Sequence, residues 1–224
     1  MQEKNQESIQ SEHSTIHRIP KRGHYDLETI HAILDSQSIC QIAFVWEGRP
    51  QIIPTLYGRD GDRVLFHGAA LSRMLKVAQE MEICFSVTAL DSYVLARSAF
   101  HHSANYRSVT LYGQAEIIEG DAEKTEALRL ITEHILPNRW DECRGPNQGE
   151  LKATTVLALK IKEGAAKVRD ADASDDPRDH KLDHWAGIVP IVQTIGEAIP
   201  AGDLRDGIEV PDSVAVLRRK FEKG

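Results

Sequence analysis

The chain has 224 residues, 41% of them hydrophobic and 27% charged, which is enough for one well-filled domain and too short for two ordinary ones. Its 27 Lys and Arg against 34 Asp and Glu give a formal charge of -7, and an acidic chain without a basic cluster is a poor binder of nucleic acid. No apolar run reaches the roughly 18 residues that a membrane-spanning helix needs, and the polar start lacks the apolar core of a secretion signal. Cys40, Cys84 and Cys143 lie far apart and suit neither a disulfide framework nor a zinc site. We therefore expect a soluble cytoplasmic protein that binds no nucleic acid, membrane or metal.

The first half of the chain predicts one helix followed by strands. Asp26 is a good N-cap for a helix over residues 27–35, whose apolar residues recur at helical spacing. The pattern then alternates, with Gly48 and Asp60-Gly61 marking turns. Because these links are too short for helical crossovers, the strands form an antiparallel meander. The expected strands cover residues 40–46, 49–57 and 63–67.

The second half predicts a mixture of helices and strands. The expected helices cover residues 70–81 and 121–136, and the expected strands cover 83–90, two segments within 93–118 joined by residues 98–105, and 153–161. A turn is expected at Asp91-Ser92, and the chain is weakly patterned from about Ala165. The fold class is mainly β with peripheral helices, an antiparallel Greek-key barrel, since closing the sheet removes exposed strand edges. The expected organisation is a disordered arm over residues 1–19, a barrel over 20–165, and an extension over 166–224 that packs on the barrel or on a neighbouring subunit.

The segment FHGAALSRMLK indicates an anion site. It runs from a strand end through a turn of small residues into a helix, and the first turn of a helix has unpaired N–H groups and partial positive charge. Ser72 adds a hydroxyl, and Arg73 adds a planar charged fork suited to phosphate. The alternative is a solvated helix face on which Arg73 pairs with an acidic neighbour.

The segment NYRSVTLYGQAEI places Arg107 in phase with an otherwise apolar strand face. Burying a guanidinium without a partner costs several kcal/mol, so Arg107 should meet an anion or a carboxylate. The opposite face carries Tyr106, Ser108 and other polar or aromatic residues, a surface suitable for a flat heteroaromatic ring. The alternative is that Arg107 lies at the strand end and reaches solvent.

The histidines do not form a metal motif. His101 and His102 are adjacent, so on a strand they would point to opposite faces, and no carboxylate or Cys spacing nearby completes a site. His67 adjoins the turn of small residues, where it faces either a ligand or a half-buried strand end. Neither a catalytic triad nor a glycine-rich dinucleotide fingerprint is present, which counts against hydrolases and Rossmann dehydrogenases.

Taken in order, four segments resemble the FMN-binding split-barrel superfamily that includes pyridoxamine 5′-phosphate oxidase. The most similar branch contains nitroimidazole-resistance and flavin-nucleotide-binding proteins. The resemblance extends from about Arg18 to Trp185. The segments are RIPKRGHYD, IAFVWEGRPQIIPTLYGRDGDRVLFHGAALSRML, LARSAFHHSANYRSVTLYGQA and WAG.

The resemblance implies an FMN site and a homodimer with FMN at the interface. Met74 replaces a phosphate-binding lysine, for which Lys76 or Arg22 would compensate, and Ser108 replaces a flavin-contacting glutamine. The C-terminal motif with which the oxidases bind the substrate phosphate is not recognisable, which argues against pyridoxamine phosphate oxidase activity. The implied cofactor-binding residues are Ile52, Ile53, Pro54, Thr55, His67, Gly68, Ser72, Arg73, Tyr106, Arg107, Ser108 and Trp185.

Three functions follow from the resemblance. The first is an FMN-dependent oxidoreductase acting on a small molecule, with NAD(P)H as an electron source and with His67 and Tyr106 as candidates for steering protons or orienting the substrate. The second is a non-catalytic flavin-binding module. The third is a haem-binding relative in which His67 or His102 is the ligand.

Overall fold

The structure is a computed structural model that describes residues 8–222. The α-helices of this part of the chain are Leu27–Asp35 (α1), Arg73–Glu80 (α2), Asp121–Ile135 (α3), Gln148–Ala153 (α4) and Asp212–Glu222 (α5). Its strands are Gly23–His24 (β1), Ile39–Trp46 (β2), Arg49–Asp60 (β3), Arg63–Ala69 (β4), Ile83–Leu95 (β5), Ser103–Gly113 (β6), Glu116–Ile117 (β7), Thr154–Lys160 (β8), Gly164–Arg169 (β9) and Gly187–Pro190 (β10). Short 3-10 helices span Pro20–Arg22 (η1), Ala99–His101 (η2), Trp140–Glu142 (η3) and Asp179–Lys181 (η4).

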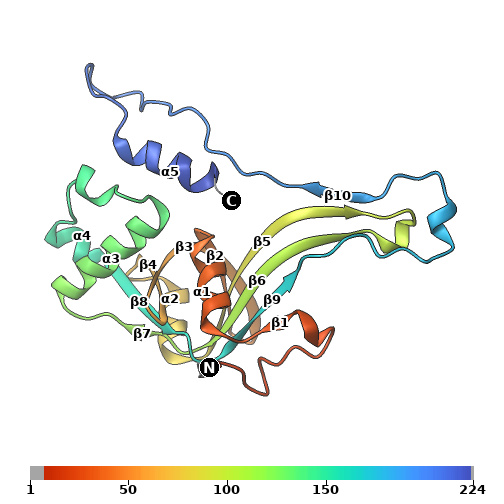
Figure 1. The fold of residues 1–224 in the computed structure, drawn as a ribbon. Helices are drawn as coiled ribbons and strands as arrows, with labels where there is room; N and C mark the ends of the chain where they lie inside the picture. Colours follow the sequence, from red (N-terminus) through yellow and green to blue (C-terminus); the bar gives the residue numbers. More distant parts are fainter. Residues whose placement is uncertain (1–7, 223–224) are drawn as a thin grey trace, which may run out of the picture.

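The strands form one curved antiparallel sheet in the order β1-β9-β6-β5-β2-β3-β4-β8-β7, with β10 paired to β5 (Figure 1). This arrangement confirms the predicted split-barrel class. The sheet is not closed, because its end strands β1 and β7 pair on one side only within residues 8–222. The expectation that closure removes the strand edges was therefore wrong for the single chain.

The main core lies inside the curved sheet and is covered by α1. Asp26 caps α1 as predicted, since its Oδ1 accepts a hydrogen bond from the Thr29 N–H at 2.8 Å. The residues of β2 alternate, with Cys40, Ile42 and Phe44 buried, because successive strand side chains point to opposite faces. The buried face of α1 and these strand residues share one cluster, which fixes α1 over the interior.

A second, smaller core lies between α3 and the outer face of the sheet. It contains Leu65 of β4, Ala127 and Ile131 of α3, and two residues of β8. The helix approaches β3 closely at Gly58, where an added Cβ would lie 2.8 Å from the Cα of Ile131. The sheet therefore has apolar contacts on both faces at β3 and β4, and α3 is fixed against it.

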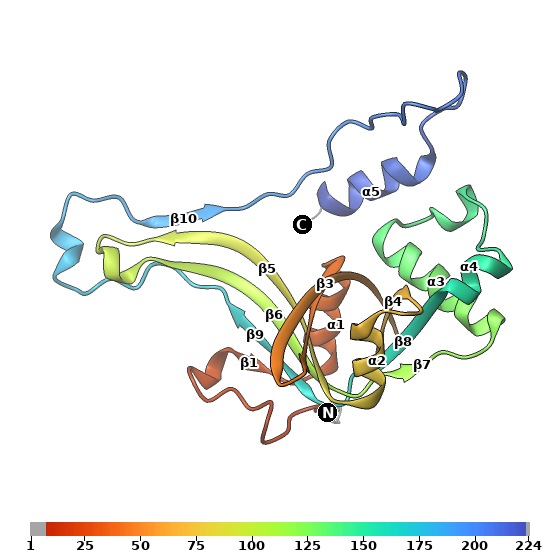
Figure 2. The ribbon, with the colours of Figure 1, turned by 180° about the vertical axis from the view of Figure 1, so that it is seen from behind.

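The strands β5 and β6 extend beyond the barrel as an arm (Figures 1 and 2). The turn predicted at Asp91-Ser92 was wrong, because β5 continues to Leu95 and pairs with β6 on both sides of this point. The register shifts between Leu90 and Ser92, so the turn residues mark an irregularity within a strand instead of its end. The chain returns from the arm as β10, which pairs with the far half of β5.

Both ends of the predicted barrel differ from expectation. The disordered segment predicted over residues 1–19 includes residues 1–7, which lie outside the described residues. In residues 8–19, Ile9 is buried and its N–H donates to the carbonyl of Tyr25. The sheet also continues past residue 165, since β9 lies between β1 and β6. Beyond it, α5 lies near α3 and η3, where Lys220 Nζ donates to the carbonyl of His134 at 2.9 Å.

Candidate functional site

The start of α2 offers the unpaired groups expected of a phosphate site. Ser72 occupies the N-cap position, and its side chain makes no capping hydrogen bond. The N–H groups of the first turn have no acceptor within the helix, and Arg73 is exposed, with its guanidinium 5.8 Å from the ring centre of Trp46 and no carboxylate partner among the described residues. Met74 is 4% exposed in the core, so this position contributes no charge.

The strand predicted to run along the cofactor is open on one edge. β3 pairs with β2 along residues 49–56, whereas β4 pairs only with Tyr57–Asp60. Ile52 and Ile53 are 65% and 38% exposed, and Pro54 is also exposed while Thr55 is half-buried. The edge and the faces of this half-strand are thus available to a ligand or to another chain.

The residues predicted on β6 and beyond lie apart from the start of α2. Ser108 donates its hydroxyl to the carbonyl of Lys167 at 3.3 Å, on the β9 side of β6, and Tyr106 is half-buried in register with Arg169 of β9. Trp185 lies on the arm next to Gly187, is 65% exposed, and does not meet the residues of α2 within one chain. Arg22, proposed as a substitute for the missing lysine, lies near Arg169, whose pKa is lowered by burial and, to a smaller extent, by the charge of Arg22.

His67 points toward α3, as does Leu65 two residues earlier. Gly68 points the other way, so that a Cβ there would lie 3.3 Å from Leu75 of α2. Burial lowers the pKa of His67, and its Nδ1 is buried without a hydrogen-bond partner among residues 8–222. The imidazole is therefore neutral and held largely by packing.

His67 lines a cavity of about 390 Å³ between β4 and the helical layer. Its walls include Thr132 of α3, Trp140 of η3 and the following loop with Arg144 and Glu150, which are joined by hydrogen bonds of 2.6 and 2.8 Å. The sequence pattern did not show that residues 128–150 enclose this histidine, because only the packing of α3 on the second core brings them together.

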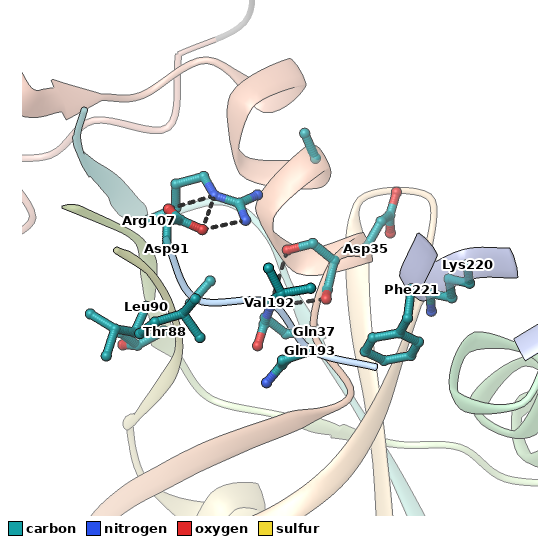
Figure 3. Close-up of a pocket in the computed structure, with 14 residues that line it drawn as sticks. Asp35, Gln37, Thr88, Leu90, Asp91, Arg107, Val192, Gln193, Lys220 and Phe221 are labelled. Atoms are coloured by element: carbon teal, nitrogen blue, oxygen red, sulfur yellow. Dashed lines mark hydrogen bonds and ion pairs between the residues drawn. The ribbon is translucent and has the colours of Figure 1, made fainter. Parts of the chain in front are cut away.

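Arg107 pairs with a carboxylate, which is one of the two partners expected for a guanidinium on the apolar face of a strand. Its Nε and Nη2 donate to both carboxylate oxygens of Asp91 at 2.8 to 3.2 Å. This pair lies beside the end of α1, in a cavity of about 670 Å³ that the C-terminal extension closes with Val192, Gln193 and Phe221 (Figure 3). Sequence reasoning missed these last residues, because neither segment of the extension carries a strong pattern.

The comparisons with known proteins agree with this fold. A family model described as pyridoxamine 5′-phosphate oxidase matches residues 26–168. The structure of the flavocytochrome Anf3 from Azotobacter vinelandii is 34% identical with a TM-score of 0.88, covering 95% of this chain and 99% of that chain. The FAD and haem binding protein from Mycobacterium smegmatis is also 34% identical, with a TM-score of 0.84, covering 88% of this chain and 97% of that chain.

A more distant structure shares the fold alone. It is that of a proposed 5-nitroimidazole antibiotic resistance protein from Bacteroides thetaiotaomicron, 19% identical with a TM-score of 0.55, covering 65% of this chain and 86% of that chain. No curated protein sequence gives a significant match. The chain is a split-barrel protein, and it belongs to the pyridoxamine 5′-phosphate oxidase family.

Proposed function

We propose that this chain is a redox protein that binds both a flavin and a haem. The observation that carries the proposal is its 34% identity, over 95% and 88% of its length, to two proteins described as a flavocytochrome and as an FAD and haem binding protein. The similarity to the flavocytochrome includes almost the whole chain, so it extends beyond the residues matched by the family model. Haem binding, the third of the functions expected from the resemblance, therefore becomes part of the proposed function.

The start of α2 is the proposed seat of the flavin phosphate. The free Ser72 hydroxyl, the N–H groups of the first turn and the unpaired Arg73 guanidinium together suit an anion. The isoalloxazine would lie along the open half of β3. These groups could bind either the phosphate of FMN or the inner phosphate of FAD. The proposed cofactor is therefore a flavin nucleotide, FMN or FAD, where the sequence predicted FMN.

His67 is the better of the two histidines proposed as haem ligand. Its ring borders a cavity and its Nδ1 is buried without a hydrogen-bond partner in residues 8–222, so the ring would meet a metal through Nε2. In His102, Nδ1 accepts a hydrogen bond from the Ala96 N–H at 2.9 Å, so a neutral ring carries its proton on Nε2, and neither nitrogen is free to coordinate iron. The apolar side chains of the cavity wall, Leu128, Ile131 and Trp140, would contact a flat, largely apolar macrocycle.

The predicted homodimer remains part of the proposal. The open half of β3 exposes Ile52, Ile53 and Leu56, and an exposed apolar strand edge is a surface that native proteins cover. A second copy would cover this edge and bring its own arm, with Trp185, toward the flavin. Sedimentation velocity at micromolar concentration should give twice the chain mass of 25.0 kDa. A flavin-loaded monomer would contradict the interface assignment.

The cofactors are tested by a visible absorption spectrum of the purified protein. We expect flavin bands together with a Soret band, and chromatography of the released flavin will distinguish FMN from FAD. The variant His67→Ala should lose the Soret band and keep the flavin, whereas His102→Ala should keep both. A spectrum without a Soret band after haem supplementation would overturn the haem assignment.

The flavin seat is tested independently with Arg73→Ala. This variant should bind flavin more weakly by about 10-fold, because a charge-assisted contact to phosphate is worth roughly 1.4 kcal/mol. Arg205→Ala, at an exposed arginine of the C-terminal extension, is the matched control for the loss of a guanidinium. Unchanged flavin affinity in Arg73→Ala would show that the phosphate lies elsewhere.

An oxidoreductase activity is the expected use of these cofactors. Flavins exchange one or two electrons and haem iron exchanges one, while the protein supplies binding, orientation and access. NAD(P)H is the electron source expected from the sequence, and His67 as a ligand would leave Tyr106 as the remaining candidate for orienting a substrate. Anaerobic bleaching of the flavin by NADH or NADPH tests the donor, and absence of turnover with nitro compounds, quinones and oxygen would favour a non-catalytic module.

A further inference from the structure

A cavity of about 670 Å³ lies away from the start of α2 and from the His67 cavity. Its floor is formed by β5 and by Arg107 of β6, one wall by the end of α1, and the remaining walls by residues 191–193 and the end of α5 (Figure 3). Because two of these walls belong to the C-terminal extension, the cavity exists only when the extension is folded back on the barrel.

The charged side chains that line this cavity are two carboxylates and two cations, and only one of the four lacks a partner of opposite charge within residues 8–222. Arg107 is balanced by Asp91, and Asp35 is balanced by Arg59 through hydrogen bonds of 2.5 and 2.7 Å. The remaining cation is Lys220, which is half-buried and donates to the His134 carbonyl without a carboxylate partner among the described residues. Lys220 is therefore the lining cation that is left to meet the negative charge of a ligand.

The uncharged lining adds polar edges and apolar faces. The Gln193 amide and the Thr88 hydroxyl border the cavity and have no hydrogen-bond partner in the described part of the chain. Phe221, Leu90 and Val192 offer apolar surface between the Arg107 end and the Lys220 end (Figure 3). Small-molecule sites commonly combine apolar walls with a few convergent polar groups in this way.

We propose that this cavity binds a small planar organic anion, an aromatic or conjugated monocarboxylate, with Lys220 as the counter-ion and Phe221 against the ring. The site is separate from the cofactors, so it does not depend on the identity of the flavin or on the presence of haem. It gives the C-terminal extension a binding role beyond covering the barrel.

The test is calorimetric titration of the purified, cofactor-loaded protein with 2-naphthoate and with its neutral isostere 2-naphthamide. We expect one 2-naphthoate site per chain and an affinity for 2-naphthamide about 10-fold lower, since the two differ in the charge that meets Lys220. Equal affinities, or no saturable binding of 2-naphthoate up to its solubility limit, would overturn the proposal.

Three variants, at two positions, test whether the ligand binds in this cavity. Lys220→Met should lower the affinity for 2-naphthoate about 5- to 10-fold and leave that for 2-naphthamide within about 2-fold, whereas Lys220→Arg should restore the preference for the acid. Ala32→Trp, on the exposed side of α1 where it borders the cavity, should weaken both ligands more than about 10-fold. Unchanged binding in Ala32→Trp would overturn the location. In all three variants the visible spectrum should be unaltered, so failure of the cofactor assignment and failure of this anion site give different results.

Discussion

The contact between β3 and α3 makes Gly58→Ala a sharp test of the fold around the site. The new Cβ would lie 2.8 Å from the Cα of Ile131, 3.1 Å from its nitrogen and 3.1 Å from the carbonyl oxygen of Leu130. All three are backbone atoms of a helix, so no side chain can rotate away. To reach the 3.4 Å at which ordinary contact begins, the helix must move by about 0.6 Å.

The magnitude follows from the cost of overpacking. Adding a methyl group where no space is free typically lowers the unfolding free energy by about 1 to 3 kcal/mol. Replacing Gly by Ala also reduces the conformational entropy of the unfolded chain, but this stabilises the protein by only roughly 0.4 to 1 kcal/mol. For a domain of this size each kcal/mol lowers Tm by about 2 to 4 °C, so we expect a decrease of about 3 to 10 °C. Because α3 also forms a wall of the His67 cavity, the variant should also bind the proposed haem more weakly.

The assay is thermal and urea unfolding followed by circular dichroism, with Gly145→Ala as the matched control. A Cβ at Gly145 meets no atom within 4 Å, so this variant should be as stable as the wild type or slightly more so. If Gly58→Ala unfolds at the same temperature as Gly145→Ala, the close packing of α3 on β3 is refuted.

Three further predictions concern buried polar groups. Tyr57→Phe should lower the free energy of unfolding by about 1 to 2 kcal/mol, because the buried Tyr57 hydroxyl donates to the Leu34 carbonyl at 2.5 Å. The control Tyr93→Phe, on the exposed arm, should leave the free energy measured by urea unfolding unchanged. Burial lowers the pKa of His134, so its imidazole resists protonation in the folded protein. The unfolding free energy should therefore fall as the pH drops below the unfolded pKa of about 6.5. A pH series in which His134→Gln has the same slope as the wild type would contradict this. Exposed Cys143 should react rapidly with a thiol reagent at pH 8. Burial raises the pKa of Cys40 to about 12, so the Cys40 thiol should react only when the protein unfolds. A fast phase that survives Cys143→Ser would refute the assignment of this phase to Cys143.

The parts of the fold that local patterns determine were predicted well. The cap at Asp26, the alternation in β2 and the hairpin at Asp60-Gly61 depend on neighbouring residues, and the structure confirms each. Arg107 was expected to meet an anion or a carboxylate because of its phase with apolar residues, and it meets Asp91.

The features that the sequence did not predict depend on distant partners. The expected turn at Asp91-Ser92 becomes part of β5 because β6 and β10 pair with the strand beyond it. β9 and α5 have weak patterns and are stabilised by the elements on which they lie. The orientation of His67 toward α3 follows from strand alternation, but the cavity around it follows from the packing of residues 128–150.

The position of β9 has a consequence for the order of folding. Among residues 8–222, β1 pairs only with β9, and β9 pairs with β6, whose residues lie more than 50 positions earlier in the chain. During synthesis, the N-terminal segment must therefore wait until residue 169 has left the ribosome before it can join the sheet. Until then the outer edge of β6 stays open, and this interval is when a nascent chain is most exposed to misassembly.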